Sequence, residues 1–178
     1  MVPTLAEAVP LLHATDELIL GLPIDAILAQ RFRLPTVDPA EFPEMVRLQI
    51  EKGLPFSADE VTTDFEVIEQ NETESVVSAI AVQNERLTEI AGVLLDRGFI
   101  PKQITVYASQ RATTYAPEGR ALLIYPEGES LVSAVTENGR VSLTRTLEGV
   151  TPEQLQMDLP QLSLSAELQG IPSSFPKV

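Results

Sequence analysis

The sequence predicts a mixed α/β fold. Three observations support this prediction: a β-α-β-β-α-β order between residues 26 and 107, a three-stranded meander at residues 121–147, and an amphipathic helix that opens at Thr151. Such an order can pack two helices on one face of a small sheet. With 178 residues, of which 44% are hydrophobic and 21% charged, the chain can bury a core as one or two small domains.

The first predicted element is a short helix. Thr4 and Glu7 have the spacing of a capping box, and apolar residues follow at helical spacing. Pro10 should shorten or kink this helix, because proline lacks the amide that bonds back one turn. Two buried strands are expected next, at residues 18–22 and 26–33, with a proline between them.

A second helix is predicted after the second strand. Asp38 is placed as an N-cap, Pro39 as the first helical residue and Glu41 as an acid in the first turn, and Gly53 ends the helix. Its apolar stripe consists of Phe42, Met45, Val46 and Ile50.

A hairpin and a third helix complete the β-α-β-β-α-β unit. Strands are expected at residues 62–69 and 74–82, and Asn84 should cap a helix that ends at Gly98. The apolar residues of that helix follow the 3.6-residue period without a gap. A strand around Ile104 closes the unit.

The remaining residues predict a meander and one helix. Asn138-Gly139 favours a type I′ hairpin turn, because both central residues need positive φ. Thr151 and Gln154 have capping-box spacing, and Gly170 should end the last helix. Pro160 conflicts with the interior of that helix.

Composition excludes several classes of function. A net charge of -14 disfavours nucleic acids and anionic lipid surfaces, which proteins bind through clusters of Lys and Arg. The absence of cysteine excludes disulfides, thiolate metal sites and a cysteine nucleophile. No apolar run approaches the roughly 20 residues of a membrane-spanning helix, so direct membrane insertion is not expected.

Several short motifs carry a resemblance to a known family. They are Leu20-Gly-Leu-Pro23 after a helix, Arg33-Leu-Pro35, the helix end at residues 51–56, Glu60-Val61, Asp64-Phe65, the helix that ends at Gly98, and residues 136–149. In these motifs the chain resembles the actin-like pilus-assembly proteins of the PilM kind and the related cytoplasmic region of GspL from type II secretion systems.

The resemblance implies an incomplete actin-like (ribonuclease H-like) lobe at residues 1–33 and 101–178, with an inserted small βαββαβ subdomain at residues 34–100. It implies that an earlier meander with the first phosphate loop, and the rest of the second lobe, lie outside this sequence. The abrupt ends of the chain agree with that expectation, and we therefore expect a piece of a longer protein.

The resemblance also implies a role. Proteins of this family are bacterial and cytoplasmic, hold the N-terminal cytoplasmic peptide of an inner-membrane partner, and link that complex to an assembly ATPase. For this chain it implies a peripheral scaffold. The sheet edges of an incomplete lobe leave strand exchange, and hence a homodimer, open. An unrelated α/β interaction domain is the alternative if residues 18–22 do not join the sheet of residues 121–147.

A degenerate loop argues against catalysis. The second phosphate loop of actin-like ATPases reads Asp-x-Gly followed by small or hydroxyl residues, and the aligned segment at residues 124–130 contains Tyr125, Glu127, Gly128 and Glu129. A tyrosine replaces the acid, Pro126 removes an amide donor, and both glutamates would repel phosphate. We therefore expect an exposed β-turn, no nucleotide, no metal and no enzyme activity. A nucleotide-dependent ATPase completed by segments outside this sequence remains the alternative.

The predicted partner-binding residues are Arg31, Arg33, Pro35, Arg47 and Phe56. The three arginines are a basic group in an acidic chain, near the two proline-containing corners. For any single arginine, pairing with neighbouring glutamates of the second helix is the expected role. The family's peptide groove lies between the main lobe and the inserted subdomain, and this resemblance favours the group as a contact site.

Other candidate residues have surface interpretations. His13 is the only histidine, and its position after a short helix favours a cation at a helix C-terminus over a catalytic base. Asp64 and Glu66 share one face of a strand, as a hard-cation site or an acid-base pair would require. With 26 acids in the chain, chance pairs are expected, and a solvated face is preferred.

Overall fold

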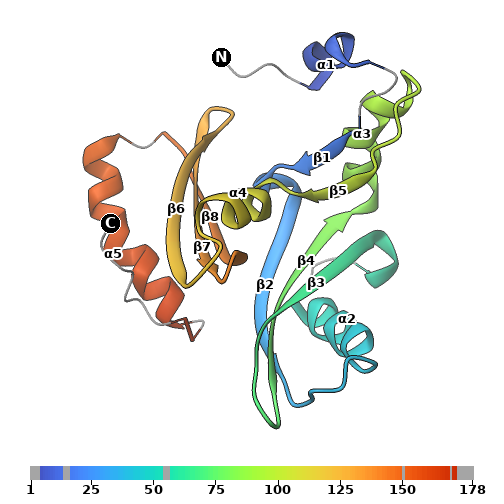
Figure 1. Cartoon of the computed structure of the whole chain (residues 1–178). Coiled ribbons are helices and arrows are strands. Elements are labelled where there is room, and N and C mark those ends of the chain that lie inside the picture. Colours follow the sequence, from blue (N-terminus) through green and yellow to red (C-terminus); the bar gives the residue numbers. More distant parts are fainter. Residues whose placement is uncertain (1–4, 14–16, 54–56, 150, 169, 172–178) are drawn as a thin grey trace.

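Three β-sheets organise the chain (Figure 1). The computed structural model describes residues 5–13, 17–53, 57–149, 151–168 and 170–171. The predicted α/β class is confirmed. In the described part of the chain, no helix is long and apolar enough to cross a membrane.

The N-terminal elements lead into a two-stranded sheet. α1 (Leu5–Ala8) passes into a 3-10 turn (Val9–Leu11) that contains Pro10, so the helix is short, as predicted. Thr4 of the expected capping box lies outside the described residues. β1 (Ile19–Leu22) pairs in parallel with β5 (Gln103–Val106).

The middle sheet has the order β2-β4-β3 and is antiparallel. Its strands are β2 (Ile27–Leu34), β3 (Val61–Gln70) and β4 (Ser75–Gln83), within one residue of the predicted bounds. α2 (Phe42–Gly53) covers one face, and its buried residues Phe42, Val46 and Ile50 pack against β2 and β4. The predicted hairpin is confirmed, and so is the helix with its end at Gly53. Its predicted start is wrong, because α2 begins at Phe42 and Asp38 forms a turn before it, in which the Ala40 amide donates to Asp38 Oδ1 and the Glu41 amide to the Asp38 carbonyl oxygen.

α3 (Asn84–Leu95) departs from the prediction in two ways. The N-cap residue is Gln83 and not Asn84. The Asn84 side chain bonds to other segments instead: its Oδ1 accepts a hydrogen bond from the Thr62 hydroxyl, and its Nδ2 donates one to the Asp59 carbonyl oxygen. The helix also does not share a sheet face with α2. It packs with β1 in a separate core cluster that includes Leu20 and Leu22.

The predicted β-α-β-β-α-β order is present as β2-α2-β3-β4-α3-β5. The last strand of this series leaves the middle sheet, because β5 pairs with β1 instead. The division into residues 1–33 with 101–178, and 34–100, stays a prediction.

α4 (Tyr107–Tyr115) was not predicted, since the sequence was expected to continue as a meander. The helix starts directly after β5, and no side chain caps its N-terminus. Two buried alanines, Ala108 and Ala112, let it lie close to the third sheet. Small residues give a weak hydrophobic pattern, so the helix is set by packing rather than by local sequence.

The third sheet is the predicted meander of β6 (Arg120–Glu127), β7 (Ser130–Glu137) and β8 (Arg140–Leu147). Asn138 and Gly139 have φ of 52° and 76°, as a type I′ turn requires. α4 lies on one face, where it meets Tyr125 and Val132, and the opposite face packs against α5 (Figure 1).

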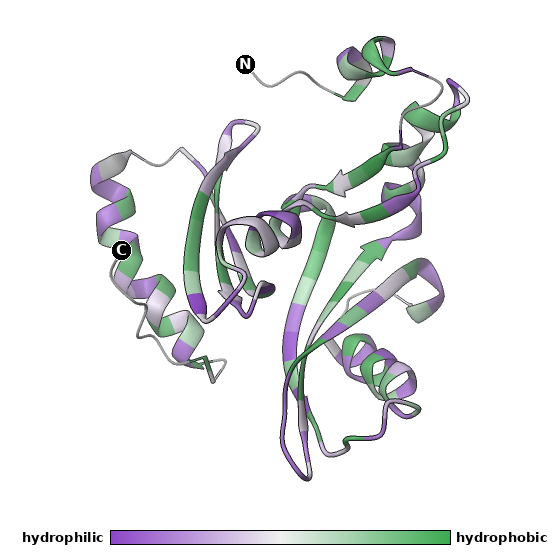
Figure 2. Ribbon diagram, in the orientation of Figure 1, coloured by the Kyte–Doolittle hydropathy of each residue, from purple (hydrophilic) through white to green (hydrophobic). Residues whose placement is uncertain are grey.

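α5 (Pro152–Leu168) opens with the predicted capping box. The Gln154 amide donates to Thr151 Oγ1 at 3.3 Å, and the Thr151 amide donates to Gln154 Oε1 at 3.0 Å. The helix continues through Pro160, whose ring is exposed. Leu162 and Ala166 beyond it are buried, so tertiary packing holds this half of the helix. Polar and apolar residues are mixed along its surface (Figure 2).

Candidate functional site

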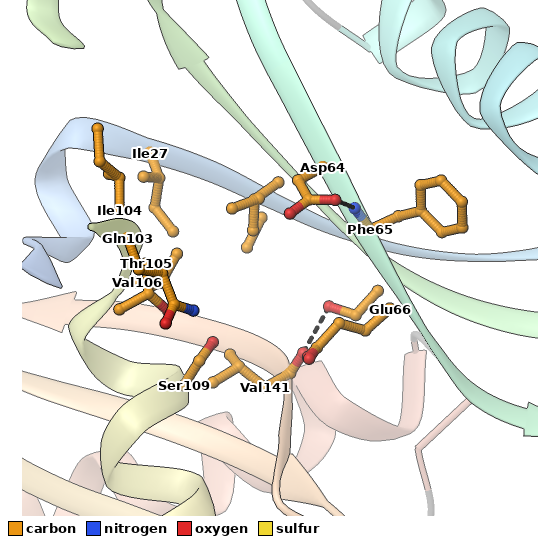
Figure 3. A pocket seen from close by; sticks show the side chains of 13 residues that line it. Ile27, Asp64, Phe65, Glu66, Gln103, Ile104, Thr105, Val106, Ser109 and Val141 are labelled. Carbon is orange, nitrogen blue, oxygen red and sulfur yellow. Dashed lines mark hydrogen bonds between the residues drawn. The ribbon is translucent and has the colours of Figure 1, made fainter. Parts of the chain in front are cut away.

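A cleft of about 150 Å³ lies between the middle sheet and the elements that follow α3 (Figure 3). Its floor is the sheet face that α2 does not cover. Asp64 and Glu66 lie on one side, and Gln103 and Ser109 lie on the other. The other lining residues are Ile27, Ala29, Phe65, Ser78, Ile80, Ile104, Thr105, Val106 and Val141.

Strand alternation produces this floor. On β4, Val77, Ala79 and Ala81 point to α2, so Ser78 and Ile80 point into the cleft. On β3, the ring of Phe65 points away and meets Phe42 of α2 edge-on at 6.1 Å between ring centroids (Figure 3). The two neighbouring carboxylates therefore face the cleft.

The cleft is acidic. Among its lining residues there are two carboxylates and no basic side chain. Burial raises the pKa of Glu66, the charge of Arg140 opposes that rise, and Asp64 adds to it. Asp64 accepts a hydrogen bond from the Phe65 amide at 2.8 Å. Carboxylates of this kind favour basic or N–H-donating groups of a ligand.

Two buried contacts hold the middle sheet against the third sheet beside the cleft. Arg31 Nε lies 3.2 Å from Glu137 Oε2, and the two side chains are 4% and 9% exposed. Ser142 Oγ donates to the same Glu137 oxygen. Ser78 Oγ donates to the Val141 carbonyl oxygen. The relative position of the two sheets is thus fixed by groups that solvent cannot easily replace.

The structure does not bring the predicted partner-binding residues together. Arg31 is buried against Glu137, whereas Arg47 lies on α2, on the opposite face of the middle sheet. Arg33 is exposed and pairs with Glu74. Arg47 pairs with Asp59, with 3.9 Å between Nη2 and Oδ1. None of these three partner carboxylates is one of the glutamates at the second helix that the sequence suggested.

Pro35 is exposed, and Phe56 lies outside the described residues. The four described members of the predicted group do not line the cleft. Their role in partner binding stays a prediction. The residues that line the cleft come from five strands (β2, β3, β4, β5 and β8) and from α4, and the sequence had suggested only Asp64 and Glu66 as a pair.

The degenerate phosphate loop has two different environments. Gly128 and Glu129 are exposed at the turn between β6 and β7, as expected. Tyr125, in contrast, is 4% exposed, and its ring packs in the core under α4. Glu127 Oε2 accepts a hydrogen bond from the Ile24 amide at 2.8 Å. The expected exposed turn is therefore limited to its two tip residues.

Glu127 sits where a phosphate-binding loop would need positive potential. Burial raises the pKa of this carboxyl, the Ile24 N–H opposes the rise, Asp25 adds to it and Arg111 opposes it. The carboxylate already occupies one backbone donor of the neighbouring turn. A phosphate at this corner would meet a fixed negative group.

A cluster of aromatic rings around Arg111 was not predicted. The guanidinium carbon lies 4.7 Å from the ring centroid of Tyr125, 5.0 Å from that of Tyr107 and 5.7 Å from that of Tyr115. These distances are typical of cation-π contacts. The i, i+4 spacing of Tyr107, Arg111 and Tyr115 was the available signal, and it was missed together with the helix that carries it.

Metal sites are not found among the described residues, where no three acidic or histidine side chains are grouped to hold an ion. His13 is exposed. Asp64 is exposed as well, in agreement with the solvated face that the sequence favoured.

Two solved structures share the fold of this chain. The PilM-PilN type IV pilus biogenesis complex matches with a TM-score of 0.66 and 18% identity, over 88% of this chain and 59% of that chain. The cytoplasmic domain of EpsL, an inner-membrane component of the type II secretion system of Vibrio cholerae, matches with a TM-score of 0.59 and 13% identity. That match covers 90% of this chain and 58% of the EpsL chain.

The chain thus spans less than two thirds of either solved structure. No protein-family model matches the sequence, and no curated protein matches it. The predicted likeness in fold to PilM and to the cytoplasmic region of a type II secretion protein is confirmed, and the division into a lobe and an inserted subdomain stays a prediction. The shared fold argues against the alternative of an unrelated α/β domain. The strand criterion given for that alternative is nevertheless met, because β1 pairs with β5 and does not join the sheet of β6, β7 and β8.

Proposed function

We propose that this protein is a non-catalytic scaffold of a type IV pilus or type II secretion platform at the bacterial inner membrane. The observation that carries the proposal is the acidic cleft between the middle sheet and α4, in a fold shared with PilM of the PilM-PilN complex and with the cytoplasmic domain of EpsL. In this proposal the protein acts in the cytoplasm and is peripheral to the membrane.

The ligand of the cleft is the cytoplasmic N-terminal peptide of an inner-membrane partner. An extended peptide fits a groove with an apolar floor, here Ile27, Ala29 and Ile80, and a polar rim. Asp64 and Glu66 would receive a basic side chain or the peptide's N–H groups. An assembly ATPase is the second partner that the scaffold would connect to this complex.

The absence of catalysis is part of the proposal. Tyr125 is a core residue, and Glu127 is bonded to the Ile24 amide. Neither side chain supports a bound nucleotide, because Tyr125 is packed among apolar core residues and the Glu127 carboxylate would repel phosphate. The net charge of -14 also supports a protein-peptide role over nucleic-acid binding or direct contact with anionic lipids.

Pull-down with synthetic cytoplasmic peptides of the inner-membrane proteins encoded beside this gene tests the proposal. Ile104 lines the cleft and is 42% exposed, whereas Ile19, 56% exposed on the paired strand β1, does not line it. We expect Ile104→Asp to lose capture and Ile19→Asp to keep it. Equal capture by both variants, with both folded by circular dichroism, would reject the cleft as the peptide site.

A further inference from the structure

A row of three polar residues crosses the middle sheet at one end of the cleft. Arg31 of β2 is in register with Ser78 of β4, and Ser78 is in register with Glu66 of β3. Residues in register on neighbouring strands point to the same face, so all three side chains face the third sheet. Ser78 and Glu66 line the cleft, and Arg31 completes the row on the outer strand. These three residues are the polar row.

The end of the β7–β8 hairpin meets the polar row with matching groups. Arg31 Nε lies 3.2 Å from Glu137 Oε2, at the end of β7. Ser78 Oγ donates to the Val141 carbonyl oxygen near the start of β8, and this bond closes one end of the cleft (Figure 3). The hairpin is thus bonded to two neighbouring strands of the middle sheet.

The charges along this contact are complementary. Glu137 and Arg140 are in register beside the hairpin turn, so an anion and a cation lie next to each other there. Arg31 and Glu66 supply the opposite order on the middle sheet. Burial raises the pKa of Glu66, and the charge of Arg140 opposes that rise. Two attractions of opposite direction fit in only one orientation of the hairpin.

A bulge in β8 directs the hairpin toward the polar row. The register of β7 and β8 shifts between Val135 and Thr136, which leaves Ser142 as the extra residue on β8. Ser142 is 1% exposed, and its Oγ donates to Glu137 Oε2. Bulges bend a strand and redirect its groups, and here the bulge lies next to the carbonyl that accepts from Ser78.

The contact between the two sheets is apolar at one end and polar at the other. Ile27 and Ile80 of the middle sheet pack against the apolar cluster of α4 and the third sheet. Arg31 follows Ile27 by four residues, which is roughly 13 Å along the strand. Apolar contacts have no fixed direction and tolerate a small rotation, whereas hydrogen bonds require a narrow range of distances. The apolar end can therefore act as a hinge.

We propose that the polar row is a latch that holds the β7–β8 hairpin against the middle sheet and sets the width of the cleft, with Ser78 as its positioning residue. The buried pair of Arg31 with Glu137 is the stable part of this latch. Glu66 is exposed, so solvent screens its attraction to Arg140. The consequence for peptide binding rests on the proposed function, because the latch joins the two walls of the proposed peptide site.

Distance measurements on the full chain without ligand test the latch. The sequence has no cysteine, so cysteines introduced at the exposed positions Glu69 of β3 and Thr114 of α4 can carry two spin labels for pulsed electron paramagnetic resonance. We expect one narrow distance in the parent protein and an additional, longer distance in Ser78→Ala. Ser75→Ala is the matched control, because Ser75 is buried on the same strand and its Oγ donates to the Thr36 carbonyl oxygen at 2.8 Å.

Both serine variants lose one bond to a backbone carbonyl, and both should lose similar amounts of stability. Only Ser78→Ala should change the distance between the labels, because only its bond joins the two sheets. Equal distances in the two variants would overturn the latch.

A charge reversal tests the exposed end of the polar row. Glu66→Lys places a cation opposite Arg140 and should lengthen the label distance, and Arg140→Gln in the same chain should restore it. Asp64→Lys is the control, because Asp64 is an exposed carboxylate on the same strand that is in register with Ile80 rather than with Ser78. A longer distance in Asp64→Lys as well, or no restoration by Arg140→Gln, would also overturn the latch.

Peptide binding separates this inference from the proposed function. If the latch shapes the peptide site, Ser78→Ala should weaken binding of a captured cytoplasmic peptide by about threefold or more relative to Ser75→Ala. The label distances need no peptide. Failure of the parent protein to capture any peptide would reject the proposed function and leave the latch supported by those distances.

Discussion

Arg31 and Glu137 form a buried ion pair that joins β2 of the middle sheet to β7 of the third sheet, with 3.2 Å between Nε and Oε2. Ser142 donates to the same carboxylate, and Arg120 Nε lies 3.6 Å from its other oxygen. The pair lies between the two layers that form the cleft. Arg31, which the sequence suggested as a contact for a partner, therefore has a clear structural role as well.

Removal of one member of this pair should strongly destabilise the protein. Arg31→Met leaves the Glu137 carboxylate buried without its main counter-charge, and we expect a loss of about 3 kcal/mol or more in the free energy of unfolding. The exposed pair of Arg33 with Glu74 supplies the control, and Arg33→Met should change stability by less than about 1 kcal/mol. Urea unfolding measures both, and similar losses in the two variants would contradict the assignment.

The turn at Asn138 and Gly139 gives a second prediction. Gly139 has φ of 76°, and a Cβ placed there would lie 3.3 Å from the Pro117 carbonyl oxygen. Gly128 has φ of 62° with open space around it. Both alanine variants meet positive-φ strain of about 1–2 kcal/mol, but Gly139→Ala adds the close contact. Thermal unfolding should show a larger loss for Gly139→Ala, and the reverse order would refute this explanation.

The stability of the protein should depend on the protonation of Glu127. Its pKa is raised in the folded state, chiefly by burial, so the folded protein binds this proton more tightly than the unfolded chain does. The resulting stabilisation is complete below the unfolded pKa and is lost as pH rises through the folded pKa.

Glu127→Gln should flatten this part of the stability profile, because the glutamine side chain is uncharged and still accepts from the Ile24 amide. Glu129→Gln removes one charge from the exposed tip of the same turn and is the control. Urea unfolding between pH 4 and pH 8 measures the effect. A profile of Glu127→Gln that keeps the full slope of the parent protein would show that this carboxyl is not responsible.

ATP should not bind to this chain. Glu127 places negative charge at the turn, and Pro126 supplies no amide to a phosphate. Calorimetry with ATP and magnesium should give no saturable heat at micromolar concentrations. A micromolar dissociation constant would instead support the ATPase alternative.

Local patterns predicted most of the fold. Gly53 marked the end of α2, and Asn138-Gly139 fixed the turn of the last hairpin, because helix ends and turns depend on residues close in sequence. α4 escaped prediction because it is short and uncapped, and its buried residues are alanines whose burial depends on the sheet beneath. The pairing of β5 with β1 was also missed, since parallel pairing joins segments about 80 residues apart and leaves no local pattern.

The candidate sites were predicted less well for the same reason. Arg31 and Arg33 looked alike in sequence, but only Arg31 has a buried partner, 106 residues away. The pairing of Asp64 with Glu66 followed from strand alternation, whereas the opposing wall at Gln103 and Ser109 required the tertiary arrangement. Side chains that converge from distant elements cannot be assigned to one cleft from their spacing.

Site-specific photo-cross-linking tests the proposed scaffold role most directly. A photoreactive residue replaces Gln103, which is exposed and lines the cleft, or Lys52, which is exposed on α2 across the middle sheet, with the inner-membrane partner co-expressed. We predict that the partner's cytoplasmic N-terminal peptide cross-links to position 103 and not to position 52. Equal yields at the two positions, or none at position 103 while the complex forms, would contradict the account.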